Sequence, residues 1–325
     1  MTYVNVNGLS LPALYERLNG QGLVQRLLEL AWVEDVGSEI EGGPDEGIGA
    51  HYPGDITSDA CIDIEQRGKA CVRARKAGIV AGLAVVPDLI DLFCSDVRWQ
   101  AHVQDGTRVQ AGETLVTLEG NAIELLRVER TMLNIVGRLS GIATLTDTYK
   151  QAMLRSGATR ARLYDTRKTT PGLRVLEKYA VRCGGGYCHR IGLWDAMLIK
   201  DNHLAGVDVG ELAHFVAKSV QRARELAGPG LSFVQVEVDS IEQLAALCTL
   251  PPGTVDIVLL DNMTPAQLRE AAAMRDAKAS QLELEASGGV NLETIAQIAA
   301  TGVDRISVGA LTHSATQLDV GLDFV

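Results

Sequence analysis

Several features are missing from this sequence of 325 residues, and each absence excludes a class of protein. The longest apolar run, Ala77 to Pro87, is far shorter than the ~20 residues that a membrane-spanning helix needs. No basic residue precedes Arg17, so we expect neither a signal peptide nor a membrane partner. The six cysteines are scattered through a chain that is long enough to need no disulfides, which predicts reduced thiols and a cytoplasmic location. Cys183, Cys188 and His189 lie close together but lack the second pair of ligands that a structural zinc site needs.

Positive charge is also scarce, since the formal net charge is −11. General binding to nucleic acid or to an anionic membrane needs a basic surface, so neither is an expected partner. The basic residues are nevertheless concentrated between Arg155 and Lys200, where ten Lys or Arg accompany only three acids. Three of the ten have the spacing of one solvated helix face. Four others lie in turns or at a strand end and are candidates for binding anions: Arg167, Lys168, Arg190 and Lys200.

Six segments of the second half have the composition of buried strands, and each is followed by polar, charged or glycine residues. They are Ala161–Asp165, Ala196–Lys200, Phe233–Glu237, Ile257–Asp261, Leu284–Ser287 and Arg305–Gly309. Helical patterns alternate with them, which implies parallel strands joined by helical crossovers and therefore an α/β fold. Because six units are fewer than the usual eight of a barrel, we expect an irregular α/β barrel with about six parallel strands. An active site would then lie at the carboxyl ends of these strands.

Helix signals separate the predicted strands. Pro171 suits a first helical position, and Gly184 suits the end of the same helix. Ser240 with Gln243, and Thr264 with Gln267, resemble capping boxes. Asn291 is a candidate cap for a helix that ends at Gly302.

The first half predicts a separate α+β domain. Lys69–Val80 and Thr107–Leu118 have β character, and Leu14–Val33 has a helical pattern. The glycine-rich acidic stretch Ser38–Tyr52 predicts an exposed loop. Asp105–Gly120 resembles the hairpin of biotinyl and lipoyl carrier domains. The chain has no lysine between Lys76 and Lys150, so covalent carriage is excluded and only a shared scaffold remains.

Longer stretches of the chain resemble the quinolinate phosphoribosyltransferase family. The most specific is "DTRKTTPGLRVLEKYAVRCGGGYCHRIGLWDAMLIKDNH", from Asp165 to His203. Shorter matches run in order across most of the chain: "GDITSDACI", "ERTMLNIVGRLSGIATLT", "VEVDS", "LLDNM", "EASGGVN" and "SVGALTHS". The resemblance implies an enzyme of NAD biosynthesis that joins quinolinate to phosphoribosyl pyrophosphate, giving nicotinate mononucleotide, pyrophosphate and CO2.

The resemblance also implies an architecture. Residues 1–136 would form an N-terminal α/β sandwich, the tail 314–325 would pack back on it, and residues 137–313 would form the catalytic barrel. The family pairs as a homodimer, and higher oligomers stay open. Arg130 matches a residue that reaches the partner's site.

Quinolinate carries two adjacent carboxylates, and the planar fork of arginine binds a carboxylate bidentately. The positions that match the family's substrate-binding residues are Arg130, Thr166, Arg167, Lys168, His189, Arg190, Lys200, Glu237 and Asp261. Without the family, Arg130 could equally be a surface ion-pair residue.

Three of these positions are expected to be catalytic. Lys200 ends an apolar run, where a lysine is costly unless a partner or ligand meets it. Glu237 and Asp261 end neighbouring strands, where two carboxylates could hold Mg²⁺ or stabilise a ribosyl cation. Two alternatives stay open: a salt bridge from the carboxylates to Lys200, and a Schiff-base aldolase that uses Lys200.

Two glycine turns are candidates for binding phosphate. Main-chain N–H groups at a turn that leads into a helix attract anions, and barrels build such sites after their last strands. The candidates are Ser287, Gly288, Gly289, Val308, Gly309, Ala310 and His313. Each turn alone could equally be an ordinary tight turn.

Three departures from the family pattern concern substrate preference. Cys188 stands where the family usually has asparagine, Trp194 replaces a small residue, and the Ser38–Tyr52 loop is longer than common. A phosphoribosyltransferase acting on another pyridine carboxylate therefore stays an alternative.

Overall fold

The computed structural model describes residues 5–37, 54–157 and 160–325, so the predicted loop at Ser38–Tyr52 lies outside the described residues. The chain forms two compact units that exchange segments. The parallel-sheet unit comprises Met1–Leu9, Thr146–Thr169 and Gly186–Ser314, and the antiparallel-sheet unit comprises Ser10–Leu145, Thr170–Gly185 and Ala315–Val325. The predicted domain limits, residues 1–136 with the tail 314–325 and residues 137–313, stay a prediction.

The parallel-sheet unit is built on six parallel strands in the order β6-β11-β10-β9-β8-β7. Their bounds are β6 Arg162–Tyr164, β7 Met197–Ile199, β8 Val234–Val238, β9 Ile257–Asp261, β10 Glu283–Ser287 and β11 Arg305–Ser307. All six strands predicted from the sequence are therefore confirmed. Strands β6 and β7 stand at the two edges and do not pair with each other, so the described sheet is not a closed barrel. Beyond β6, an isolated parallel bridge joins Tyr164 to Tyr187.

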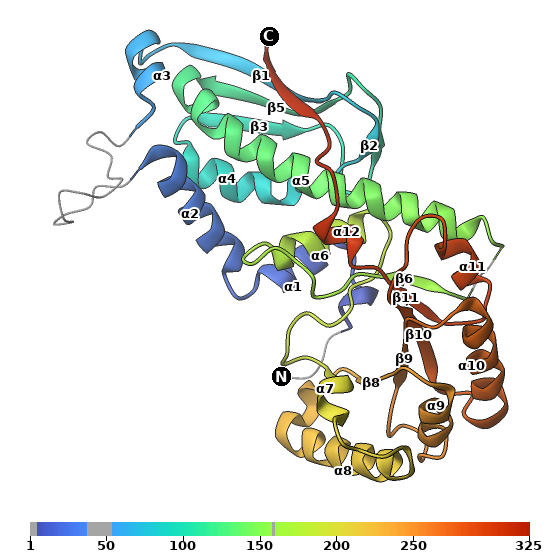
Figure 1. Ribbon diagram of the computed structural model, residues 1–325. Coiled ribbons are helices and arrows are strands. Elements are labelled where there is room, and N and C mark those ends of the chain that lie inside the picture. The colour runs from blue at the N-terminus through green and yellow to red at the C-terminus, as the bar shows by residue number, and fades with distance from the viewer. Residues whose placement is uncertain (1–4, 38–53, 158–159) are drawn as a thin grey trace. The chain divides into compact units, whose positions relative to one another are not determined.

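The helices of this unit are α7 Asp201–Leu204, α8 Val209–Ala227, α9 Ile241–Leu247, α10 Pro265–Lys278, α11 Ile295–Ala299 and α12 Ala310–His313, with 3-10 turns at Val6–Gly8 and Gly228–Gly230. In Figure 1, α8, α9, α10 and α11 lie on the outer side of the sheet, whereas α12 lies beyond the carboxyl end of β11. The predicted capping box of Thr264 and Gln267 is present at the start of α10. At α9 the Ser240 hydroxyl caps the helix, but the Gln243 side chain accepts from the main chain of Asp239 instead of completing a box.

The antiparallel-sheet unit has a four-stranded sheet in the order β12-β1-β5-β3 and a small pair, β2 with β4. The strands are β1 Arg67–Ala74, β2 Gly78–Ile79, β3 Val97–Ala101, β4 Arg108–Val109, β5 Thr114–Asn121 and β12 Val320–Phe324. Both segments of predicted β character thus contain strands, each split in two. The end of the chain supplies β12, which pairs antiparallel with β1. The helices are α1 Leu11–Asn19, α2 Leu23–Val36, α3 Ile56–Cys61, α4 Val86–Phe93, α6 Arg174–Cys183 and α5 Ala122–Leu154, whose last residues belong to the parallel-sheet unit.

Two predicted helices differ from the structure at glycine or proline. The segment Leu14–Val33 is two helices, α1 and α2, because the chain turns between them and Gly22 adopts a positive φ of 68°. Pro171 does not begin a helix: residues 171–173 form a turn in which Gly172 has φ 82°, and α6 begins at Arg174. The predicted end of α6 is confirmed, because Gly184 is its C-terminal cap.

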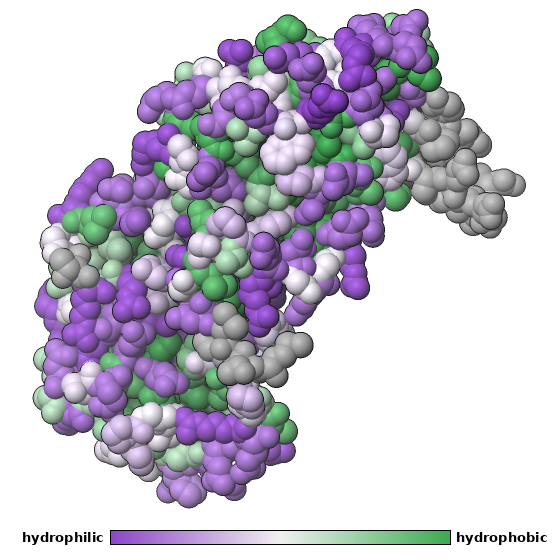
Figure 2. All heavy atoms as spheres, turned by 180° about the vertical axis from the view of Figure 1, so that it is seen from behind, coloured by the Kyte–Doolittle hydropathy of each residue, from purple (hydrophilic) through white to green (hydrophobic). Residues whose placement is uncertain are grey.

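The interior of both units is filled mainly by aliphatic side chains. Hydrophilic side chains cover most of the face shown in Figure 2, and hydrophobic ones show between them. Among the helices that the structure describes, none combines the length and the apolar composition that crossing a bilayer requires.

Candidate active site

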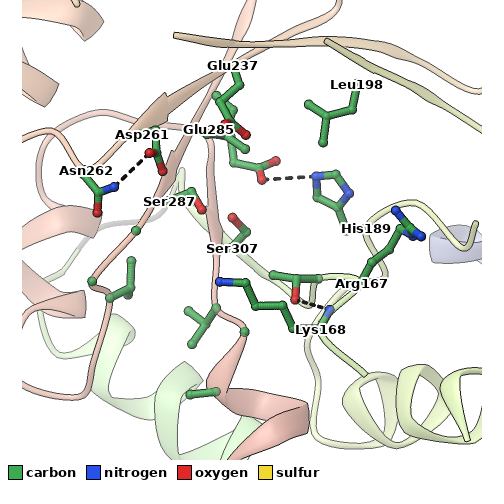
Figure 3. Close-up of a pocket in the computed structure, with 18 of the residues that line it drawn as sticks. Arg167, Lys168, His189, Leu198, Glu237, Asp261, Asn262, Glu285, Ser287 and Ser307 are labelled. Atoms are coloured by element: carbon green, nitrogen blue, oxygen red, sulfur yellow. Dashed lines mark hydrogen bonds and ion pairs between the residues drawn. The ribbon is translucent and has the colours of Figure 1, made fainter. Parts of the chain in front are cut away.

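A cavity of about 740 Å³ lies at the carboxyl ends of the parallel strands, and all of its lining residues belong to the parallel-sheet unit (Figure 3). It brings together every predicted site residue except one. These are Thr166, Arg167, Lys168, His189, Arg190, Lys200, Glu237, Asp261, Ser287, Gly288, Gly289, Val308, Gly309, Ala310 and His313.

The exception is Arg130, which lies on α5 in the antiparallel-sheet unit. Its side chain is 66% exposed, and a guanidinium nitrogen lies 3.7 Å from a carboxylate oxygen of Glu129. This contact is the surface ion pair that the sequence left open. The role of Arg130 in a partner's site stays a prediction.

Two cations follow β6 in a turn with a fixed main chain. The Thr166 hydroxyl accepts a hydrogen bond from the Lys168 N–H at 3.0 Å, and the Thr312 hydroxyl donates to the Lys168 carbonyl at 2.7 Å. Within the described residues, Arg167 Nε is buried without a hydrogen-bond partner, and Lys168 makes no ion pair. In Figure 3 the Lys168 ammonium points into the cavity toward Ser307. Both charges are therefore available to an anion.

His189 and Arg190 come from the segment beyond the Tyr187 bridge, and both are buried. The Asp165 carboxylate holds this segment by accepting from the His189 N–H at 2.7 Å. The ring of His189 accepts through Nδ1 from the Arg190 N–H at 2.8 Å, while Nε2 lies 3.2 Å from a carboxylate oxygen of Glu285. Protein groups therefore meet both ring nitrogens.

Lys200 and Glu237 form an ion pair with 2.8 Å between Nζ and Oε2. This is the salt bridge that the sequence allowed as an alternative to direct binding. The Lys200 side chain is 43% exposed. A Schiff-base lysine is activated by desolvation or by a neighbouring cation, and Lys200 has neither a dry site nor a cationic partner in this contact. The arrangement therefore does not favour the aldolase interpretation.

Asp261 ends β9 and is oriented by the next residue. The Asn262 amide donates to the Asp261 carboxylate at 2.8 Å, and the Asn262 N–H donates to the Ser287 carbonyl at 2.9 Å. Asn262 has a positive φ of 52°, a conformation that asparagine tolerates better than most residues. Asn262 thus joins the carboxylate of β9 to the glycine turn after β10.

That turn has room only for glycine at its first position. A Cβ at Gly288 would lie 2.2 Å from the Asn262 amide oxygen, whereas a Cβ at Gly289 would meet nothing within 4 Å. Both residues have positive φ, 87° and 62°. In the second turn, a Cβ at Gly309 would lie 2.9 Å from Lys168 Cδ and 3.2 Å from His313 Nε2. Backbone therefore approaches the cavity closely at both turns.

The predicted helix cap at Asn291 is displaced. The Asn291 side chain accepts from the N–H groups of Glu293 and Thr294, but these residues form a turn and α11 begins only at Ile295. The helix ends at Ala299 rather than at Gly302. The first glycine turn therefore leads into a capped turn, not directly into a helix.

Several lining residues were not predicted from the sequence. Four lie two positions before a predicted residue, within the same segment that the sequence predicts as a strand: Leu198, Leu259, Glu285 and Ser307. Side chains two apart on a strand share a face, so this period was a usable signal. Asn262 and Val290 also line the cavity and directly follow predicted residues.

Glu285 is the fully buried carboxylate of the cavity. Burial acts to raise its pKa, but the contacts with His189, Arg305 and Ser307 act in the opposite direction and lower the pKa to about 2. Glu285 is therefore an anion at neutral pH, with His189 on one side and Arg305 on the other.

The two nearby departures from the family pattern lie outside the lining. Cys188 is buried, and its main-chain N–H and carbonyl bond the Asn7 side chain at 2.8 Å each. Trp194 is 63% exposed and packs so closely on Gly192 that a Cβ there would lie 2.5 Å from its Nε1. Across the described part of the chain, no group of three or more His, Cys, Asp or Glu side chains could hold a metal ion by itself.

Comparison with known proteins gives consistent matches over most of the chain. The family model described as quinolinate phosphoribosyl transferase, C-terminal domain, matches residues 142–323, and the model of the N-terminal domain matches residues 55–140. The nicotinate-nucleotide pyrophosphorylase [carboxylating] of Mycobacterium leprae is 44% identical, over 84% of this chain and 92% of the relative. A protein of Bacillus subtilis with the same name, marked as probable, is 37% identical over 92% and 93%. The solved structure of the nicotinate-nucleotide pyrophosphorylase from Francisella tularensis superimposes with a TM-score of 0.79 at 31% identity, covering 99% of this chain and 100% of that one.

Proposed function

Since the chain belongs to the quinolinate phosphoribosyl transferase family, we propose that it transfers phosphoribosyl from phosphoribosyl pyrophosphate to quinolinate with decarboxylation. The products are nicotinate mononucleotide, pyrophosphate and CO2, a step of NAD biosynthesis. The observation that carries the proposal is the cavity, in which cations, two strand-end carboxylates and two glycine turns face one space.

Quinolinate would bind on the side of Arg167, Lys168 and Arg190. A ring with two adjacent carboxylates needs several cations in fixed geometry, and these three come from two neighbouring segments of main chain. Within the described residues Arg167 Nε has no hydrogen-bond partner, which supports this assignment, because a carboxylate that binds this nitrogen displaces no described partner. His189 would position this group of cations.

The phosphoribosyl group would bind across the strand ends, with its phosphate at the two glycine turns. Exposed main-chain N–H groups and close backbone approach suit a phosphate. Ser287, Gly288 and Gly289 would form one side, and the turn at Val308–Ala310 with His313 would form the other.

Quinolinate nitrogen would then attack the anomeric carbon as pyrophosphate leaves. The ribosyl centre gains positive charge in this transition state, and the carboxylates of Glu237 and Asp261 would stabilise it electrostatically. The Lys200 ammonium, paired with Glu237, would meet an anionic group of the substrates. The protein thus supplies orientation and preorganised charge.

Glu237 and Asp261 also fit Mg²⁺, which is bound by one or two carboxylates together with substrate phosphate oxygens. No third protein ligand is needed for such a site, consistent with the absence of a larger ligand cluster in the described residues. When bound, the ion would neutralise charge on the leaving pyrophosphate.

Decarboxylation would follow from the new bond to nitrogen. The electron pair of the breaking carbon–carboxylate bond stays on the ring carbon as CO2 departs, where the adjacent positive nitrogen stabilises it as an ylide, and this carbon then takes up a proton. Because the positive nitrogen supplies this stabilisation, the step needs no pyridoxal or thiamine cofactor.

The active assembly would be a homodimer in which Arg130 reaches the cavity of the partner subunit, with further assembly open. Its guanidinium is 66% exposed and lies 3.7 Å from Glu129, which is compatible with that role. We place the enzyme in the cytoplasm, because all six of its cysteines are free thiols.

The test is a reaction with quinolinate, phosphoribosyl pyrophosphate and Mg²⁺, assayed for both mononucleotide and CO2. Nicotinate in place of quinolinate is the control, because it separates decarboxylating from non-decarboxylating relatives. Mononucleotide from nicotinate but not from quinolinate would overturn the proposal. Borohydride treatment should leave Lys200 unmodified, since only an imine can be reduced onto it.

A further inference from the structure

Three buried side chains form an ionic cluster at the bottom of the cavity, here called the floor triad: His189 and Glu285, which line the cavity, and Arg305, which does not. Glu285 comes from β10 and Arg305 from the neighbouring β11, where the two residues are register partners. Glu285 is fully buried, and His189 and Arg305 are 7% and 6% exposed. An ionised carboxylate in such a place is costly unless it is paired, so the contacts of Glu285 must compensate its buried charge.

Each carboxylate oxygen of Glu285 meets a different partner. Oε2 accepts a hydrogen bond from Arg305 Nε at 2.8 Å. Oε1 lies 3.2 Å from His189 Nε2, within ion-pair distance but without hydrogen-bond geometry toward the ring. The dashed line in Figure 3 marks this second contact. Arg305 thus holds Glu285 from one side and leaves the other oxygen for the histidine.

The contacts of His189 fix which nitrogen carries the proton. Nδ1 accepts from the Arg190 N–H, so it carries no hydrogen, and the proton of the neutral ring must lie on Nε2, facing Glu285. Two aromatic rings, Tyr164 and Phe233, stand edge-on to the imidazole at centroid distances of 6.5 and 5.6 Å. The same two rings lie beside the Arg305 guanidinium, at 3.8 and 5.4 Å. The ring therefore has one orientation and one tautomer.

We propose that Glu285 is a positioning residue of the dicarboxylate site: its negative charge, 3.2 Å from Nε2, favours the His189 tautomer that carries the proton on Nε2, and His189 in turn holds the main chain of Arg190. The Arg190 side chain lines the cavity, so the position of its main chain sets where the guanidinium can reach. This inference rests on the proposed function, because it assigns Arg190 to quinolinate. The same chain of contacts gives His189 a role that requires no contact with substrate.

Replacement of Glu285 by glutamine gives an outcome that a merely structural carboxylate would not give. Glutamine has one oxygen, and the permanently charged Arg305 will take it as acceptor. The amide N–H of the new side chain then faces His189 Nε2 and needs an acceptor there, which moves the ring proton to Nδ1. Nδ1–H can no longer accept from Arg190, and that main-chain bond is lost.

The matched control is Glu283→Gln. Glu283 precedes Glu285 on the same face of β10 and also contacts Arg305, at 3.5 Å, but makes no contact with His189 in the described residues. Its side chain is 36% exposed. The two variants remove the same charge from the same strand, and only one of them should change the histidine.

The experiment is nitrogen NMR on the full chain labelled at histidine, with the His189 signals assigned from their loss in His189→Gln. The unaltered protein and Glu283→Gln should show an unprotonated Nδ1 and a protonated Nε2, and Glu285→Gln should show the reverse. Calorimetry should then find quinolinate binding about 10- to 100-fold weaker in Glu285→Gln, a typical cost of misplacing a binding group, and unchanged in Glu283→Gln.

Two results would overturn the inference. One is a protonated Nδ1 in the unaltered protein, which needs no variant and stands even if Glu285→Gln fails to fold. The other is a folded Glu285→Gln that binds quinolinate as tightly as the unaltered protein. Failure of the unaltered protein to bind quinolinate would instead refute the proposed function, and the tautomer measurement would still decide the role of Glu285.

Discussion

Replacing Arg167 with alanine is expected to weaken quinolinate binding more than any other single change on the cation side of the cavity. Arg167 lines the cavity and is only partly exposed, and its Nε is buried without a partner among the described residues. Its main chain is held independently, because the turn is fixed through Thr166 and Thr312. The substitution should therefore remove the charge without unfolding the turn.

The size of the effect follows from the state of this guanidinium. Because Nε has no hydrogen bond to any described residue, most of the energy of a new bond to a carboxylate appears as affinity. Removing one partner of a buried charge pair costs about 2–5 kcal/mol, since the other charge is left without compensation. At about 1.4 kcal/mol for each tenfold change, the dissociation constant should rise from about 30-fold to several thousandfold.

Calorimetric titration with quinolinate measures this directly. Arg167→Lys keeps the charge but loses the planar fork, so it should fall between the unaltered protein and Arg167→Ala. Arg269→Ala, an exposed position on α10 outside the cavity lining, removes a charge from the same unit and should leave binding unchanged. Equal affinity of Arg167→Ala and Arg269→Ala would refute the assignment of Arg167 to quinolinate.

Three further outcomes are expected. Glu237→Gln should lower kcat about 100- to 1000-fold, because it removes negative charge that stabilises the ribosyl cation, and it should change quinolinate affinity little. Steady-state kinetics will check this, with Glu242→Gln at an exposed position as the control. Gly288→Ala should raise the KM for phosphoribosyl pyrophosphate, and it should lower the urea midpoint of unfolding more than Gly289→Ala does. Both glycines have positive φ, but only a Cβ at Gly288 would collide with Asn262. Equal urea midpoints for the two variants would contradict the close packing of this turn. The lowered pKa of Glu285 stabilises the folded chain at pH values above 4.5, the ordinary pKa of a glutamate, and this contribution is lost as the pH falls toward about 2. The free energy of unfolding of the unaltered protein, measured against pH, should therefore approach that of Glu285→Gln across this interval.

The fold was largely accessible from local sequence, because each buried strand of the parallel sheet is a short apolar run closed by polar residues. The errors lie where a local signal had two interpretations. Pro171 can begin a helix or a turn, and Gly172 with its positive φ decided for the turn. The helical pattern of Leu14–Val33 continues through a break at Gly22. Closure of the barrel could not be predicted, because pairing of β6 with β7 depends on the tilt and stagger of the whole sheet.

The sequence predicted the site residues at the strand ends but not the charged residues one layer below them, Glu285 and Arg305. Residues at a strand end are recognisable because charge follows an apolar run, as at Lys200 and Asp261. Glu285 and Arg305 lie inside their strands, where a charge on its own argues against burial. Only the three-dimensional pairing of β10 with β11 places these two charges together and makes both tolerable.

That pairing also explains how an acidic protein can present an electropositive cavity. The lining carries four cations, Arg167, Lys168, Arg190 and Lys200, against the carboxylates of Glu237, Asp261 and Glu285. The carboxylates are already engaged: Glu237 binds Lys200, Asp261 accepts from Asn262, and Glu285 is neutralised from beneath by Arg305, which is not a lining residue. Among the residues that the structure describes, no carboxylate pairs with Arg167 or Lys168, and both face the cavity. An incoming dianion meets uncompensated positive charge there, although the chain as a whole carries a net charge of −11.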